Sequence, residues 1–287
     1  MERKYYQGYS IIQLQKIINN KWGIHMKKFM VGLSIACLVL IMAACGGSKD
    51  ASGSAKGDTL QSIKDKGEMK IALEGAYPPY NYINKSNELE GFDVDIAQEV
   101  AKRLGVKAVL VSNPWDSMIP ALTGKKFDII ISDMAITEER KKKVSFSDPY
   151  FTTGNQLFVP KDSSIKEPKD MKGKKIGVTI STTAAEEVTK LGADVKLYKN
   201  DFLAFEDLVN GRLDGVSTDQ GVGAKIILDQ NYSLVAIDGL LNTELAGMTI
   251  RKEDNDFRKE INKVIAEIQK DGKYEEISKK WFGKDIR

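Results

Sequence analysis

The hydrophobic and polar positions between residues 59 and 287 predict strands and helices in alternation. An apolar run at 71–73 predicts a strand, and apolar residues at four-residue spacing predict a helix over 93–104 that Gly105 ends. Further elements are expected in the order strand, helix and buried strand, at 106–111, 117–122 and 127–131. This alternation favours parallel sheets with helices on their faces, which is an α/β fold.

A short internal repeat indicates two similar lobes. The segment 124–133 (GKKFDIIISD) is similar to the segment 211–219 (GRLDGVSTD). In both, a helix is expected to end at Gly and a strand to follow, with Asp133 or Asp219 at the carboxyl end of that strand. Because ligands bind at this edge of open α/β sheets, we expect each lobe to present an Asp to a shared cleft.

The N-terminal residues have the pattern of a secretory signal. Two Lys residues precede the apolar run 29–42, and two Ala residues precede Cys45. This pattern resembles the lipobox of bacterial lipoproteins, with Met42 where Leu is more common. We therefore expect Cys45 to be a lipid attachment site. The alternative is an uncleaved membrane anchor, but about 16 apolar residues are fewer than the roughly 20 that a spanning helix needs.

These features divide the N-terminal part into three segments. We expect Met26 to be the true start, with 1–25 as a wrongly assigned extension and 26–44 as the signal peptide. The Ser-, Gly-, Ala- and Lys-rich residues that follow, 45–58, predict a flexible tether. The rest of the chain is expected outside the cytoplasm and anchored to the cell membrane, on its periplasmic side if an outer membrane is present.

Removal of residues 1–44 changes the composition of the mature chain. These residues carry six Lys or Arg and one Glu, so the formal net charge changes from +3 to −2, and no basic footprint for nucleic acid is left. Their removal also takes away Cys37 and His25, the only His. The remaining chain can form no disulfide, no His-containing zinc site and no His-based acid–base catalyst, and we expect no metal and no cofactor.

Several motifs in order along the chain resemble the polar amino-acid-binding proteins of ABC importers, which are bacterial solute-binding family 3. They lie at 76–80, 91–104, 135–140, 146–150, 175–178, 271–274 and 280–283. The resemblance implies a type II periplasmic-binding-protein-like fold, in which two α/β lobes are joined by two crossover hinge segments and close over the ligand.

The resemblance also implies the limits of the two lobes. Lobe one would comprise 59–155 plus 246–287, and lobe two would comprise 156–245. The crossovers would lie near 154–156 and 246–248. A monomer is expected.

The carboxylate of a free amino acid needs a cation or a set of N–H donors. Arg140 could hold it with a bidentate guanidinium. The alternative is a solvated Arg on the surface. This alternative is weakened because a cation in the first turn of a helix that starts at Thr137 opposes the helix dipole, so another interaction must favour the residue there. The loop before a helix near Ala184 could supply backbone N–H groups, although an ordinary helix cap is the commoner meaning of its residues. The resemblance assigns the carboxylate to Arg140, Thr182 and Thr183.

The ammonium group needs an anion or carbonyl oxygens. The resemblance assigns this role to Asp219, whereas a surface turn is the alternative from sequence alone. Ser132, Asp133 and Ala135 place a second carboxylate beside backbone carbonyls that usually meet the ammonium in the family. Two carboxylates that face each other across a desolvated cleft repel unless a cation lies between them.

The remaining candidates concern the side chain of the ligand. The resemblance places Tyr77, Tyr80 and Trp115 on the wall of the site, where aromatic faces attract cations. Core packing is the better interpretation for Tyr80, and Trp115 could equally staple the start of the helix after Asp116. Glu74, at the end of the first strand, occupies a position that contacts ligand side chains in some relatives. Together these residues favour a basic or amide amino acid, with arginine or lysine first and histidine or glutamine next.

We therefore expect a lipid-anchored receptor that binds a free amino acid by cleft closure and delivers it to ABC permease subunits, and not an enzyme. An enzyme similar to cyclohexadienyl or arogenate dehydratase is the alternative, because a fold alone does not fix function. It would need Glu74 or Asp133 as a general acid with a raised pKa. The sensor module of a receptor kinase would need a second transmembrane segment and a cytoplasmic domain.

Overall fold

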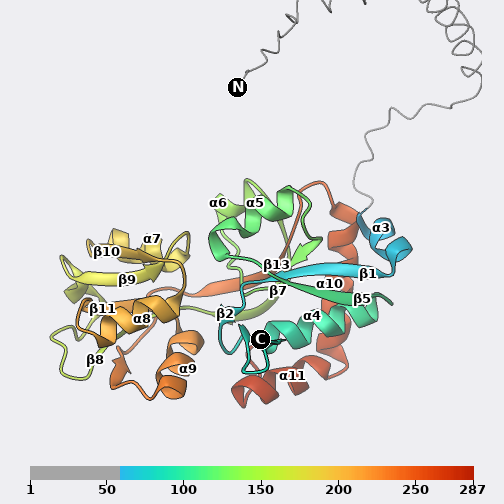
Figure 1. Cartoon of the computed structure of the whole chain (residues 1–287). Coiled ribbons are helices and arrows are strands. Elements are labelled where there is room, and N and C mark those ends of the chain that lie inside the picture. The colour runs from blue at the N-terminus through green and yellow to red at the C-terminus, as the bar shows by residue number, and fades with distance from the viewer. Residues whose placement is uncertain (1–58) are drawn as a thin grey trace, which may run out of the picture. The chain divides into compact units, whose positions relative to one another are not determined.

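The computed structural model describes residues 59–287 (Figure 1). The expected extension, signal peptide, lipid attachment site at Cys45 and tether lie outside the described residues. Two five-stranded sheets, each covered by helices, form two lobes, so the predicted two-lobe α/β fold is confirmed. Among residues 59–287, no helix has the length and hydrophobicity needed to cross a membrane.

The first sheet has the strand order β5-β1-β6-β13-β7. Its strands are β1 (Glu68–Leu73), β5 (Lys107–Ser112), β6 (Ile129–Ile130), β7 (Ser145–Thr153) and β13 (Glu244–Ile250). The first three are parallel, and β13 runs antiparallel to both β6 and β7. Alternate residues of β1 enter different cores, because successive side chains of a strand point to opposite faces. Ile71 belongs to the larger core, whereas Ala72 packs in the cluster that contains Met118.

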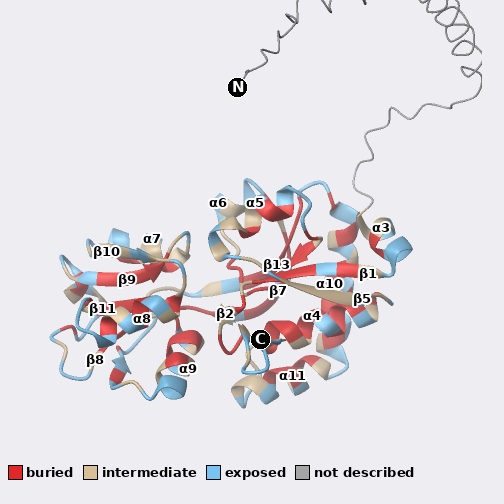
Figure 2. Cartoon of the chain, viewed as in Figure 1, coloured by how far each residue is buried: buried red, intermediate tan, exposed pale blue. Residues whose placement is uncertain are grey.

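The second sheet has the order β10-β9-β11-β8-β12. Its strands are β8 (Asn155–Pro160), β9 (Lys175–Thr179), β10 (Asp194–Tyr198), β11 (Gly215–Asp219) and β12 (Leu234–Ala236). Here too the first three strands of the order are parallel, and the last two pairings are antiparallel. Figure 2 shows buried residues along the strands of both sheets and on the helix faces that cover them.

The helices follow the alternation that the hydrophobic pattern predicts. Those of the first lobe are α3 (Thr59–Lys66), α4 (Phe92–Arg103), η1 (Trp115–Ser117), α5 (Met118–Thr123), α6 (Glu138–Lys141), α10 (Asn255–Lys270) and α11 (Lys273–Phe282). Those of the second are η2 (Pro168–Met171), α7 (Thr183–Lys190), α8 (Asp201–Val209) and α9 (Gln220–Gln230). A small antiparallel sheet is formed by β2 (Ala76–Tyr77), β3 (Asn81–Ile83) and β4 (Leu89–Glu90).

The internal repeat occupies equivalent places in the two lobes. In the first lobe the backbone N–H of Lys70 donates to the Asp128 carboxylate (2.8 Å) at the start of the central strand. In the second the N–H of Lys175 donates to Asp214 in the same way (2.7 Å). The strands β1, β5 and β6 therefore correspond to β9, β10 and β11, and their carboxyl ends lie at the same edge of each sheet.

Two crossovers join the lobes and contact each other. The first passes through Gly154, between β7 and β8, as predicted. The second lies before Glu244, because β13 pairs with β7 from Glu244 onward, and residues 246–248, where it was expected, lie inside that strand. The N–H of Asn155 donates to Asn242 Oδ1 (2.8 Å), and the N–H of Leu241 donates to the Asn155 carbonyl (2.7 Å).

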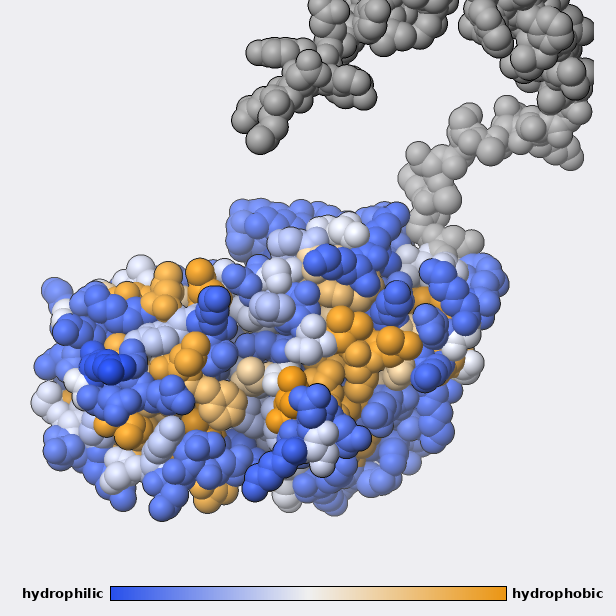
Figure 3. All heavy atoms as spheres, viewed as in Figure 1, coloured by the Kyte–Doolittle hydropathy of each residue, from blue (hydrophilic) through white to orange (hydrophobic). Residues whose placement is uncertain are grey.

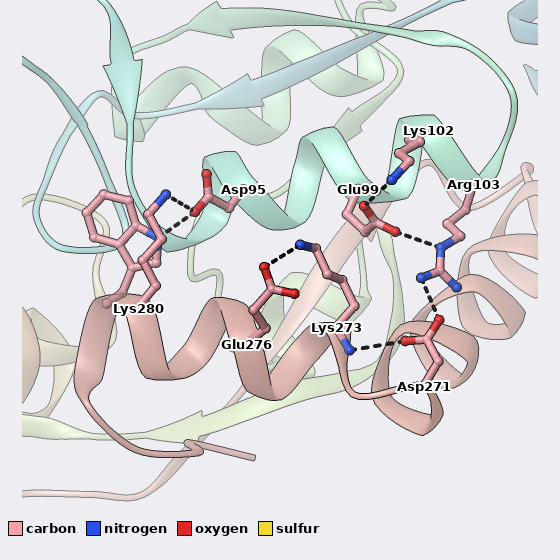
Figure 4. Close-up of polar contacts among 9 residues, drawn as sticks. Asp95, Glu99, Lys102, Arg103, Asp271, Lys273, Glu276 and Lys280 are labelled. Carbon is pink, nitrogen blue, oxygen red and sulfur yellow. Dashed lines mark hydrogen bonds and ion pairs between the residues drawn. The ribbon is translucent and has the colours of Figure 1, made fainter.

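Ion pairs and aromatic rings join α11 to α4 (Figure 4). Asp95 accepts hydrogen bonds from Lys280 Nζ (2.6 Å) and Trp281 Nε1 (2.7 Å), both on α11. The aromatic ring of Phe92 on α4 lies 5.3 Å from that of Phe282. Because exposed ion pairs contribute only about 0–1 kcal/mol, we attribute most of the stability of this contact to the packing of the buried Phe92 ring against the half-buried Phe282 ring.

One edge of the first sheet is partly hydrophobic on its surface. The residues of β5 from Ala108 to Val111 are only half-buried, since β5 has a neighbouring strand on one side alone. In Figure 3 hydrophobic side chains gather over this edge, whereas most of the visible face of residues 59–287 is hydrophilic.

Candidate ligand-binding site

A cavity with about 450 Å³ of empty space lies between the two lobes. It follows the carboxyl ends of the parallel strands of both sheets, as expected for an open α/β fold. Eight of the ten predicted ligand-binding residues line it, and the full lining consists of Glu74, Tyr77, Trp115, Asp133, Ala135, Arg140, Asn155, Thr179, Thr182, Thr183, Ala184, Asp201, Ser217, Thr218 and Glu244.

Arg140 brings a guanidinium group into this cavity. Its Nη1 donates to the Ala135 carbonyl (2.9 Å), and its Nη2 donates to the carbonyl of Ser181 in the other lobe (3.3 Å). Burial lowers the pKa of Arg140, but a guanidinium stays protonated in proteins. Since the group has five N–H donors, about three remain for a ligand.

The dipole argument for Arg140 has little force in the structure, although the residue lies in the cavity. Helix α6 has only four residues, so Arg140 lies in its first turn and its last turn at once. Thr137 caps the helix by accepting a hydrogen bond from the Arg140 N–H (3.1 Å). The short helix therefore positions the side chain without an electrostatic penalty.

The N-terminal turn of α7 faces the same cavity from the second lobe. Thr182 caps the helix through a hydrogen bond from the Ala185 N–H (3.3 Å), and its hydroxyl donates to the Thr179 carbonyl (2.6 Å). Thr182 thus fills the cap role and also lines the cavity with Thr183. A helix N-terminus next to a guanidinium forms a favourable environment for a carboxylate.

Four carboxyl groups line the cavity against the single guanidinium of Arg140. They are those of Glu74, Asp133, Asp201 and Glu244. Burial, and then the charge of Asp201, raise the pKa of Glu74 to about 8. Burial raises the pKa of Asp201 to about 6. Burial therefore disfavours the charged forms of Glu74 and Asp201, and a single guanidinium lines the cavity to offset this effect.

Asp133 lies where the predicted carboxylates face each other. Burial raises its pKa well above the usual range, and the nearby charge of Asp219 is the next cause. The backbone of Asp133 has a positive φ of 44° and donates its N–H to the Tyr150 hydroxyl (3.2 Å), which donates to Asp93 (2.7 Å). A non-glycine residue in this conformation is held by its surroundings, a common feature of binding sites.

Two of the predicted residues do not line the cavity. The Ser132 hydroxyl accepts hydrogen bonds from the Glu74 N–H (3.1 Å) and Asn81 (3.2 Å), so it supports the end of β1. Asp219 caps α9 by accepting hydrogen bonds from the Gly221 and Val222 N–H groups (2.7 and 3.2 Å), and Thr153 also donates to it. Asp219 therefore affects the site through its charge, which contributes to the raised pKa of Asp133.

The aromatic candidates lie in two different environments. Tyr77 and Trp115 line the cavity, whereas Tyr80 is buried in the core and stacks on Phe151 with ring centroids 5.2 Å apart. Trp115 Nε1 donates to the Ser181 carbonyl across the cavity (3.1 Å), and the Arg140 guanidinium carbon lies 5.2 Å from the centre of the Trp115 ring. Trp115 and Arg140 thus share one carbonyl of the opposite lobe.

Sequence reasoning missed six polar residues of the lining: Asn155, Thr179, Asp201, Ser217, Thr218 and Glu244. Most of them lie in the second lobe. The internal repeat held a signal for Asp201, because α8 corresponds to α5, and the helical turn η1 directly before α5 begins with the predicted wall residue Trp115. Residues 59–287 hold no group of three or more His, Cys, Asp or Glu side chains arranged to bind a metal ion.

Comparisons with known proteins show similarity over most of the chain. The model of the family described as bacterial extracellular solute-binding proteins, family 3, matches residues 69–284. An L-cystine-binding protein of Escherichia coli is 36% identical over 265 residues, which cover 91% of this chain and 99% of that protein.

Solved structures show the same similarity. The arginine-bound form of truncated ArgBP from T. maritima has a TM-score of 0.70 and 40% identity, covering 72% of this chain and 99% of that one. An ancestral amino acid-binding protein, a precursor of cyclohexadienyl dehydratase, has a TM-score of 0.74 and 37% identity, covering 78% and 100%.

Proposed function

Because this chain belongs to the bacterial extracellular solute-binding proteins of family 3, we propose that it captures a free polar amino acid and delivers it to an ABC permease. The observation that carries the proposal is the charge asymmetry of the cavity. Arg140 and the N-terminal turn of α7 offer a place for a carboxylate, and the carboxyl groups around Asp133 offer one for an ammonium. Thr182 and Thr183 would complete the carboxylate site.

We assign the ligand to the basic or amide amino acids, with arginine or lysine first and histidine or glutamine next. Four carboxyl groups against one guanidinium favour a ligand with an additional positive charge. Tyr77 and Trp115 add aromatic faces that attract cations. The arginine-bound T. maritima structure supports this assignment, and the similarity to an L-cystine-binding protein makes cystine a necessary competitor in the test.

Closure of the two lobes is the proposed mechanism. The Ser181 carbonyl of the second lobe accepts hydrogen bonds from Arg140 and Trp115 of the first, so contacts between the lobes form at the cavity itself. A ligand that contacts both lobes favours the closed state, and the permease would recognise that state. We place the hinges at the two contacting crossovers, at Gly154 and before Glu244, so the lobe limits lie within two residues of those expected at 155/156 and 245/246.

We also propose attachment to the membrane through acylated Cys45, after cleavage of the signal peptide 26–44. The basic, apolar and small-residue pattern before Cys45 supports this part of the proposal. Metabolic labelling with a palmitate analogue should mark the mature protein, and an unlabelled mature form would contradict it. The receptor would work outside the cytoplasm as a monomer.

A thermal-shift screen tests the binding function. The purified protein is heated with each of the twenty amino acids, ornithine, cystine and arogenate. A ligand present at about 100 times its dissociation constant adds roughly 2.7 kcal/mol of stability, which shifts the melting temperature measurably. We expect shifts with a few basic or amide amino acids. If no amino acid shifted the melting temperature, the proposed function would be contradicted.

Replacement of Arg140 tests the orientation of the ligand. Arg140→Ala should lower the affinity by about 10- to 100-fold, because a hydrogen bond to a charged group contributes roughly 1.5–3 kcal/mol. The fold of the empty protein should be retained, since Arg140 forms no ion pair within residues 59–287. Isothermal titration calorimetry measures the affinity. An unchanged value would remove Arg140 from the site.

An enzyme on the same fold is the second candidate, and one observation favours it. A pKa of about 8 leaves Glu74 protonated near neutral pH, as a general acid requires. The ancestral precursor of cyclohexadienyl dehydratase is also among the similar structures. Incubation with arogenate, followed by chromatography of the products, separates the two functions. We expect arogenate to be recovered unchanged, and formation of phenylalanine would favour the enzyme.

A further inference from the structure

Two carboxyl groups from different lobes line the same cavity without a basic ion-pair partner in residues 59–287. Glu74 follows β1 in the first lobe, and Asp201 begins α8 in the second. The charge of Asp201 acts on Glu74 directly. Neither group forms an ion pair with a Lys or Arg of residues 59–287.

Asp201 is 2% exposed and has only neutral partners. Thr179 Oγ1 and Thr218 Oγ1 each donate to one of its carboxylate oxygens (2.7 and 2.8 Å). A carboxylate offers about four acceptor positions, so roughly two remain open toward the cavity. A buried carboxylate without a cation is costly to maintain, and this cost is removed when a cationic group binds beside it.

Ser217 provides a second and independent indication of a ligand. It is 0% exposed, it lines the cavity, and its hydroxyl has no hydrogen-bond partner in the described part of the chain. Buried hydroxyl groups are nearly always hydrogen-bonded in native proteins. The missing partner of Ser217 therefore belongs to the contents of the cavity.

We propose that Glu74, Asp201 and Ser217 form a subsite for the guanidinium end of an arginine-like ligand, an inference that rests on the proposed function. A guanidinium is planar and has five N–H donors in a fixed arrangement, so it can reach acceptors of both lobes at once. An ammonium has three donors on one atom and bridges such a set less well. Because the acceptors come from both lobes, the subsite is complete only when the cleft is closed.

A purely structural role for Asp201 is the competing explanation. In that case the carboxylate only holds Thr179 and Thr218, and its charge has no effect on which ligand binds. The chain offers a comparison in Asp93, which is also buried and accepts hydrogen bonds from Tyr150 and Asn81 but does not line the cavity. The two explanations are separated by measuring how the charge of Asp201 affects the binding of ligands that differ in charge alone.

The decisive experiment compares arginine with citrulline, its neutral counterpart of nearly the same shape. Calorimetric titrations are made on the wild-type protein, Asp201→Asn and Asp207→Asn. Asp207 lies on the same helix, but its carboxylate is engaged by Tyr198 and Arg212. Asp201→Asn should lower the affinity for arginine about 10- to 100-fold and change that for citrulline by less than about threefold. Asp207→Asn should alter neither.

Two further variants keep the proposal testable if Asp201→Asn fails to fold. Glu74→Gln removes the opposite carboxylate and should produce the same loss of preference for arginine, while Ser217→Ala should weaken arginine binding by about two- to tenfold. Wild-type protein that binds arginine and citrulline equally, or variants that lose both ligands in parallel, would overturn the subsite. Wild-type protein that binds no amino acid would instead overturn the proposed function.

Discussion

At the scale of single residues, the cavity concentrates carboxyl groups whose charged forms are disfavoured by burial. Glu74, with a pKa of about 8, holds a proton at neutral pH in the empty cleft. Asp201, with a pKa of about 6, is largely ionised there. A cation bound between them favours the charged form of both, so binding and ionisation are coupled.

We predict that arginine binding releases protons near pH 7. A bound guanidinium lowers the pKa of Glu74 from about 8, so the proton held in the empty protein is lost on binding. The affinity should therefore increase as the pH rises from about 6 to about 8. Calorimetry in two buffers with different ionisation enthalpies measures the number of protons released.

Citrulline provides the control for this coupling, since a neutral ligand should release few protons. Glu74→Gln should abolish most of the release with arginine. In the empty protein the raised pKa of Glu74 affects stability, which decreases as the pH rises, in contrast to the affinity. Its contribution to stability is complete below the unfolded value of 4.5 and is lost as the pH rises through about 8. Proton uptake on arginine binding would contradict the assignment.

At the scale of elements, the local pattern predicted those parts that local forces determine. The helix expected at 93–104 is α4 (Phe92–Arg103), because its apolar spacing and the following Gly105 act within the segment itself. The strand expected at 127–131 is assigned only over Ile129–Ile130, although the Asp128 and Ile131 N–H groups also donate to carbonyls of β1. Its length is set by a neighbouring strand, which the segment does not encode.

The same distinction explains which site residues were found. Arg140 belongs to a motif that resembles a family, and Trp115 matches a wall position of that family, so both could be proposed from the sequence. Asp201 and Ser217 belong to no such motif, and their contact with the cavity depends on how α8 and β11 pack together. Asp219 was expected in the lining, but its role as the cap of α9 engages its carboxylate.

The buried cation Arg251 joins several elements of the first lobe, and its loss should be severe. Its guanidinium donates to the carbonyl of Phe127 (2.8 Å) and to Thr59 (3.0 Å), and it pairs with buried Asp254 (2.8 Å). Arg251→Met should lower the free energy of unfolding by about 3–5 kcal/mol, because Asp254 is left as an unpaired buried charge. Urea denaturation measures this loss.

An exposed pair on the neighbouring helix α10 is the control. Lys259 and Asp256 lie 2.9 Å apart with more than two thirds of each side chain exposed. Lys259→Ala should change stability by less than about 0.5 kcal/mol. Equal losses in the two variants would show that burial of the Arg251 pair has no special importance.

At the scale of the whole described molecule, the two crossovers determine how the lobes can move. They contact each other near Gly154, where an added Cβ atom would lie 2.2 Å from the Asn242 carbonyl oxygen. A hinge motion must therefore move both segments together, since the backbone of Asn155 forms hydrogen bonds with the Leu241 N–H and the Asn242 side chain of the other segment.

Gly154→Ala tests this contact. The clash is with backbone, so one crossover must shift, and we expect a loss of about 1–3 kcal/mol in stability. Ligand affinity should also decrease, because the closed arrangement of the lobes is disturbed. Urea denaturation and calorimetry measure the two effects on one sample. If the Gly154→Ala variant kept both the stability and the affinity of the wild-type protein, the crossovers would have to separate freely.

The strand order of the two sheets has a consequence for how the polypeptide acquires its structure. Strand β13 lies between β6 and β7, so the first sheet needs residues 244–250, whereas the second sheet uses only the continuous stretch from Asn155 to Ala236. When such a chain emerges N-terminus first, β1, β5, β6 and β7 appear before β13, so the first sheet cannot be completed until residues 244–250 have emerged. The middle of the chain can therefore fold before its beginning, the reverse of the usual vectorial order.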